Sequence, residues 1–201
     1  LMYPDCAERL LSAYAMDADA RLSAVAAIDT IQPPGLGAAQ VETRVRTNLS
    51  LRNWGAAWIP NRLRGWMVDN LLMLGLENRF VPYDALRYPK LSPLDDRLAE
   101  AGVFPMRLMS GFRMTVRRAV ALKEPSDETL LAYSPAEDLD SSYRFLRHGV
   151  NATASTALVY HHETAANRLK RRSVAELHLL NIAYFVRRSS RTQALHRTLY
   201  Y

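Results

Sequence analysis

Residues 5–30 contain neither glycine nor proline, and they are rich in alanine and leucine. Both residue types favour helices, and Leu10, Tyr14 and Val25 lie at roughly helical spacing. No part of the chain shows the regular alternation of apolar and polar residues that is typical of a half-exposed strand. This combination predicts a helix over residues 5–30 and constrains the whole chain towards a helical fold.

Further helices are expected where apolar residues recur every three to four positions between turn and capping signals. Gly75 and Gly102 each follow such a pattern, at the place of a left-handed residue after a helix. Ser134 and Glu137 have the spacing of a capping box, with Pro135 at the first helical position. The predicted helices span residues 61–74, 92–101, 105–122, 134–148 and 163–195.

Residues 32–37 interrupt the helical pattern, because two prolines remove backbone donors and two glycines favour turns. We therefore predict an all-α fold, an irregular bundle of short helices with a long basic C-terminal helical extension. The expected organisation is an N-terminal helix over 1–32, a linker and tryptophan-rich entry over 33–57, a helical core over 58–150 and the basic extension over 151–201.

The net charge of the chain, +6, is concentrated near its end. Residues 151–201 hold eight lysines or arginines against Glu163 and Glu176, and eight minus two accounts for the whole charge. Such a segment is suited to phosphate, an anionic lipid surface or an acidic protein face. The basic residues expected to make these contacts are Arg168, Lys170, Arg171, Arg172, Arg187 and Arg188.

The sequence offers few candidates for catalysis. His161, His162 and Glu163 are adjacent, but neighbouring side chains on a helix point about 100° apart and are not expected to chelate one metal. Cys6 is the only cysteine, and we interpret it as a small buried hydrophobe. We expect no metal, no cofactor and no catalytic activity of the chain's own. An enzyme that uses His161 or His162 is the least favoured alternative.

Trp54, Trp58 and Trp66 lie close together around Pro60, and each carries a large ring with one donor. We expect them to anchor a local core or a partner interface. No apolar stretch approaches the roughly 20 residues needed to cross a bilayer, so no transmembrane helix is expected. The chain begins at Leu1 rather than methionine, which is consistent with a removed import sequence.

Short motifs between residues 58 and 147 follow the order found in the small matrix-side subunit of the mitochondrial cytochrome bc1 complex, the ubiquinone-binding or binding-protein family. Leu74-Gly75-Leu76 resembles that family's L-G-L, and Phe104-Pro105 resembles its L-P, with Arg118-Ala119 in the place of its R-A. Leu122 to Pro125 is similar to a proline-containing loop of the family. Glu137-Asp138, followed by Tyr143 and Phe145-Leu146, resembles its E-D-x-x-Y-L-x-P-Y.

This resemblance implies an all-helical, non-catalytic structural or assembly subunit of respiratory complex III, the ubiquinol–cytochrome c reductase. It implies a peripheral position on the matrix side of the mitochondrial inner membrane, with cytochrome b and the core subunits as partners. The chain departs from the family in having Glu77-Asn78 after L-G-L and no tryptophan directly before Glu137. The expected partner-contact residues are Trp54, Trp58, Trp66, Arg113, Arg117, Arg118, Tyr143 and Phe145.

A second resemblance covers residues 157–170, which are similar to the DNA-reading helix-turn-helix of PucR-type bacterial regulators, A-L-x-x-H-x-x-T-x-x-x-R-L-K. It implies the alternative function, a transcriptional regulator that binds DNA through residues 152–172. His161, Thr164 and Arg168 would then lie at the front of a recognition helix, with residues 170–172 on phosphates. We favour the respiratory subunit because its motifs keep their order over a longer part of the chain.

Overall fold

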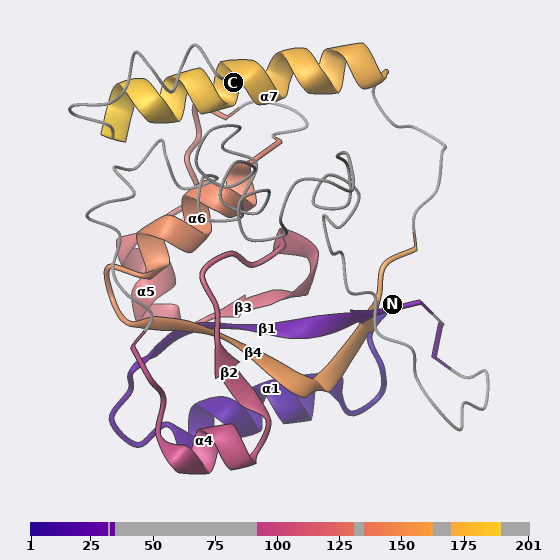
Figure 1. Cartoon of the computed structure of the whole chain (residues 1–201), viewed down its shortest axis with the longest axis vertical. Coiled ribbons are helices and arrows are strands. Elements are labelled where there is room, and N and C mark those ends of the chain that lie inside the picture. The colour runs from indigo at the N-terminus through magenta and orange to yellow at the C-terminus, as the bar shows by residue number, and fades with distance from the viewer. Residues whose placement is uncertain (32, 35–91, 131–134, 163–169, 190–201) are drawn as a thin grey trace, which may run out of the picture. The chain divides into compact units, whose positions relative to one another are not determined.

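The computed structural model describes residues 1–31, 33–34, 92–130, 135–162 and 170–189, and it shows a mixed sheet with helices (Figure 1). The all-α prediction is therefore wrong. The elements along the chain are α1 Cys6–Met16, β1 Leu22–Thr30, α4 Asp96–Glu100, β2 Val103–Pro105, the 3-10 helix η4 Gly111–Arg113, β3 Met114–Val116, α5 Arg118–Lys123, α6 Glu137–Phe145, β4 Val150–Tyr160 and α7 Arg171–Ser189.

The chain divides into two compact units, residues 1–44 with 89–181, and residues 45–88 with 182–201. The first unit contains the sheet and the helices α1, α4, α5 and α6. Its four strands have the order β2-β4-β1-β3. The two central strands, β1 and β4, are parallel, whereas β3 pairs antiparallel with β1 and β2 pairs antiparallel with β4.

Helices cover both faces of the sheet, and each face has its own core (Figure 1). Helices α1 and α4 pack on one face through Cys6, Leu10, Ala13 and Leu98, against strand residues that include Val25 and Ala157. On the other face, Ala24 and Ala26 of β1 contact a cluster with Met109, Val120 and Phe145, which brings in α5 and α6. The small alanines of β1 and β4 let both helical layers approach the sheet closely.

The predicted helix over residues 5–30 is instead a helix, a turn and a strand. Helix α1 ends at Met16, and the side chain of Asp17 accepts the backbone N–H groups of Arg21 at 3.0 Å and Leu22 at 2.7 Å. Ala20 adopts a left-handed conformation with φ 52°. Because β1 is buried on both faces along almost its whole length, its sequence lacks the alternation that reveals a half-exposed strand.

Two other predicted helices also contain strands. Residues 105–122 hold the end of β2, η4, β3 and the first part of α5, so only a short helix forms there. The helical core therefore includes sheet, and the basic extension begins with β4 rather than with a helix. Like β1, β4 is a largely buried alanine-rich strand, and its sequence carried no clear strand signal.

Helices lie within the predicted segments 92–101 and 134–148, but they begin later than predicted, at Asp96 and Glu137. Asp95 accepts the backbone N–H of Arg97 at 3.0 Å and begins α4, and Gly102, with φ 78°, follows its end. Helix α6 starts after Ala136, which has φ 72° and forms no side-chain cap. Helix α7 lies within the predicted 163–195 segment, while the predicted 61–74 helix and the three tryptophans lie outside the described residues.

Gly149 provides a direct test of this packing. A Cβ atom added there would overlap the backbone oxygen of Arg21 and approach Ser23 Oγ to 2.7 Å, so Gly149→Ala should lower the free energy of unfolding by about 2 kcal/mol or more. Gly111 is the matched control, because the nearest atom to its added Cβ is 3.9 Å away. Urea unfolding should show Gly111→Ala within about 1 kcal/mol of the parent. Equal effects of the two substitutions would contradict the packing.

Candidate functional site

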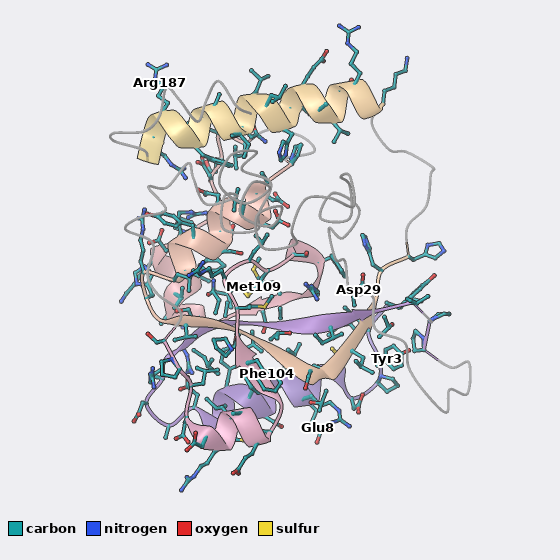
Figure 2. All side chains as sticks on the ribbon, in the orientation of Figure 1. Tyr3, Glu8, Asp29, Phe104, Met109 and Arg187 are labelled. Carbon is teal, nitrogen blue, oxygen red and sulfur yellow. The ribbon has the colours of Figure 1, made fainter. Side chains whose placement is uncertain are left out.

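The carboxyl ends of the two central strands meet at one edge of the sheet. Asp29 and Thr30 at the end of β1 pair in register with Val159 and Tyr160 at the end of β4. In open α/β sheets, ligands bind outside the carboxyl ends of the parallel strands. Figure 2 shows Asp29 at this end of β1, so we built the candidate site from the residues around it.

Asp29 is a largely buried carboxylate with few hydrogen bonds. It is 7% exposed, and its Oδ1 accepts only the backbone N–H of His161, at 3.3 Å, among the described residues. By contrast, Asp17 accepts three donors, two backbone N–H groups and Arg117 Nη2, and Asp140 pairs with Arg144 at 2.8 Å. A carboxylate can accept about four hydrogen bonds, so within the part of the chain that the structure describes Asp29 has more acceptor capacity left than Asp17.

An aromatic pair lies beside this carboxylate. The ring of Phe112, in η4, stacks on the ring of His161 with centroids 4.2 Å apart and an interplanar angle of 16°. η4 is held at this edge because Arg113 Nη1 donates to the backbone oxygen of Ala27 at 3.1 Å and β3 begins directly afterwards. Phe112 is nevertheless 46% exposed, so part of its surface is open to a ligand.

This arrangement combines two binding properties. The carboxylate of Asp29 can accept hydrogen bonds from hydroxyl or amine groups, and the stacked rings can support a planar ring. Within the described ranges, no three His, Cys, Asp or Glu residues are grouped so that they could hold a metal ion. His161 and His162 directly follow a strand, so the helical spacing that we assumed for them does not apply.

The predicted partner-contact residues lie in different environments, some in the packed interior and others at the surface. Arg117 donates through Nε to the backbone oxygen of Leu22 at 2.9 Å and pairs with Asp17 at 2.8 Å. Phe145 is buried in the core at 5% exposure. Arg117 and Phe145 therefore stabilise the fold. Arg113 is half-buried at the candidate site, Arg118 is exposed at the start of α5, and Tyr143 is half-buried with the guanidinium of Arg147 5.0 Å from its ring centroid.

The predicted basic contacts lie mainly on α7 or next to it. Lys170, Arg172, Arg187 and Arg188 are exposed, and Arg172 pairs with Glu176 at 2.8 Å. Arg171 begins α7, and Arg168 lies outside the described residues. Residues 157–160 of the helix-turn-helix pattern belong to β4, so the structure contradicts a helical start for that motif.

Asp29 and Phe112 are the site residues that the sequence analysis missed. Asp29 directly follows the mostly apolar segment Leu22 to Ile28, and an acid in that position is a usable signal only after the segment is recognised as a buried strand. Phe112 lies within residues 105–122, which the spacing of apolar residues predicted to be one helix. Its place at the site depends on the tertiary structure.

Comparisons of this chain with protein-family models, with curated proteins and with solved structures find no match. Membership of the respiratory-subunit family and of the regulator family both remain predictions. Among the described helices, none is long and apolar enough to cross a membrane. The functional argument therefore starts from the geometry at the carboxyl edge of β1 and β4.

Arg117 and Arg118 are neighbours with different environments, which makes them a matched pair. Arg117→Ala should lower the free energy of unfolding by roughly 2–3 kcal/mol, because it leaves the nearly buried carboxylate of Asp17 without its cationic partner. Arg118→Ala removes an exposed side chain and should change the free energy of unfolding by about 0.5 kcal/mol or less. Chemical unfolding of both variants measures the two stabilities. A larger loss of stability for Arg118→Ala than for Arg117→Ala would contradict the structural role given to Arg117.

Cys6 should react slowly in the folded protein. Burial raises the pKa of its thiol, the charge of Asp5 raises it further, and only the thiolate reacts with iodoacetamide. At pH 8 we expect alkylation of the folded chain to be about tenfold or more slower than in urea. A Cys6→Ser, Ala7→Cys variant moves the thiol to an exposed position of α1 and should react rapidly. Rapid alkylation of native Cys6 would contradict its burial.

Proposed function

We propose that the chain is a binding protein that holds a nucleoside-type ligand at the carboxyl edge of β1 and β4. A nucleoside joins a planar base to a ribose with two neighbouring hydroxyl groups, and the site offers one group for each part. The observation that carries the proposal is the remaining acceptor capacity of the buried Asp29. No catalytic step is included in this proposal.

The ribose is assigned to Asp29. Hydrogen bonds to an ionised carboxylate are stronger than those between neutral groups, and two hydroxyl donors would fill acceptor positions that the described residues leave open. An acid near the end of a β-strand contacts ribose in the same way in dinucleotide-binding α/β folds. This comparison concerns the chemistry of the contact and implies no relationship between the proteins.

The base is assigned to the exposed surface of Phe112. A stack between a base and an aromatic side chain contributes about 1–3 kcal/mol and tolerates different bases, because every base presents a π face. His161 supports Phe112 from one side and also donates its backbone N–H to Asp29. The same residue thus links the carboxylate and the aromatic ring, which keeps the two parts of the site together.

The respiratory-subunit hypothesis concerns protein partners and is separate from this proposal. It implied an all-helical body, but Phe104-Pro105, one of its motifs, lies in β2. The DNA-regulator hypothesis requires a helix-turn-helix, and its first residues lie in β4. We propose ligand binding in preference to both, because it is supported by contacts among described residues.

The test compares adenosine with 2′-deoxyadenosine, which lacks one of the two ribose hydroxyls. By isothermal titration calorimetry, the parent should bind adenosine about tenfold or more tightly than the deoxy form, the usual effect of losing a hydrogen bond to a charged group. Asp29→Asn should weaken adenosine binding by a similar factor and remove most of the difference between the two ligands. Phe112→Ala should weaken both ligands about equally, since it removes the base stack.

Asp19→Asn is the control, because Asp19 is an exposed aspartate in the turn before β1. It should bind both ligands as the parent does. Thermal unfolding of all variants separates a lost contact from a lost fold. The proposal fails if the parent binds neither nucleoside, or if Asp29→Asn keeps the full preference for adenosine.

A further inference from the structure

We propose that the protein binds a water molecule in its interior, between Ser23 on β1 and Asn151 on β4. This site lies at the amino ends of the two strands, whereas Asp29 lies at the carboxyl end of β1. The inference is therefore independent of the nucleoside site. It is built from two buried oxygen atoms and from the hydrogen bonds around them.

Both oxygen atoms are buried and have hydrogen-bonding capacity that the protein does not use. Ser23 is 1% exposed and Asn151 is 0% exposed. Among the described residues, none forms a hydrogen bond with Ser23 Oγ or with Asn151 Oδ1. A buried polar group without a partner destabilises the folded state, so such groups in proteins nearly always bond to protein or to ordered water. The two oxygens therefore indicate a small polar ligand.

The pairing of β1 with β4 brings the two residues side by side. Ala24 pairs with Asn151, and the register shifts just before this pair, which makes Ser23 an additional residue of β1 at a β-bulge. Ser23 Oγ also lies close to Gly149, since a Cβ atom added to that glycine would be 2.7 Å from it. Gly149 and Asn151 are two positions apart, so both oxygens lie where the chain enters β4.

The orientation of the Asn151 amide is set by its other hydrogen bond. Asn151 Nδ2 donates to the backbone oxygen of Ser142, on α6, at 2.8 Å. Because a backbone oxygen only accepts, this bond distinguishes the amide nitrogen from the amide oxygen. Ala24, the strand partner of Asn151, packs in the same cluster as Phe145 of α6. Asn151 Oδ1 is therefore an acceptor that requires a donor on the α6 side of the sheet.

Water fits these two oxygens better than other small ligands do. A water molecule can donate to Asn151 Oδ1 and can either donate to Ser23 Oγ or accept from it. A calcium ion takes six to eight oxygen ligands, including carboxylates, whereas these two oxygens are neutral. A larger ligand is not expected, because Ala24 and Val150 beside the site are also buried.

The water would connect elements that meet at the amino ends of the strands. The backbone oxygen of Ser23 accepts the N–H group of Arg117, directly before α5, at 2.9 Å. Asn151 is bonded to Ser142 of α6. A water between Ser23 and Asn151 therefore links the bulge of β1, the start of α5 and the middle of α6. Buried waters of this kind are part of the structure and are costly to remove.

The experiment counts the long-lived internal waters of the full chain by oxygen-17 magnetic relaxation dispersion, which detects waters that stay bound for longer than the protein takes to rotate. Ser23→Val and Asn151→Leu each replace one polar partner by an apolar side chain. Each substitution should lower the number of long-lived waters by about one. A crystal structure of the parent should show a water within about 3.2 Å of both Ser23 Oγ and Asn151 Oδ1.

Ser12→Val is the matched control, because Ser12 is exposed on α1 and its hydroxyl donates to the backbone oxygen of Glu8 at 2.9 Å. It should keep the number of long-lived waters of the parent, and circular dichroism should show which variants are folded. The crystal structure tests the proposal even if a variant does not fold. The proposal is overturned if the crystal shows no water between the two oxygens or a direct hydrogen bond between them, or if folded Ser23→Val keeps every long-lived water.

Discussion

The parallel pairing of β1 with β4 is the constraint on which the described part of the first unit depends. β1 lies between β4 and β3, and β4 lies between β1 and β2, so both central strands are paired on both sides. This pairing supplies backbone hydrogen bonds that the two buried segments require. It also joins residues 22–30 to residues 150–160 across most of the chain, and it brings Asp29 next to His161.

Buried charges hold the surrounding elements to these strands. Asp17 satisfies the backbone where α1 turns into β1, and its pair with Arg117 links that turn to the start of α5. Tyr14 lies under the Arg117 guanidinium and donates its hydroxyl to the backbone oxygen of Thr115, and burial raises its pKa so that it remains a donor. Among the described residues Asp29 accepts one backbone N–H group, and this difference from Asp17 is the reason that we propose it as a binding residue.

Some features followed from local sequence alone. Helix ends depend on nearby residues, so the left-handed Gly102 after α4 was predicted correctly, and helices were expected in the segments that contain α4 and α6. The burial of Cys6 was also correctly predicted, as expected for a lone cysteine among apolar residues. The two central strands could not be placed, because alanine-rich segments buried on both faces lack periodicity, and alanine itself favours helices.

The sequence by itself determined the left-handed glycine after α4, the segments that contain α4 and α6, and the concentration of basic residues towards the end of the chain. Only the tertiary structure decided that residues 22–30 and 150–160 are paired strands, that Arg117 serves the fold, and that Asp29, Phe112 and His161 meet at one edge. The physical reason is the distance along the sequence between the residues that interact. A cap is satisfied within one helical turn, whereas a buried strand and a site built from its end depend on partners far away in the chain.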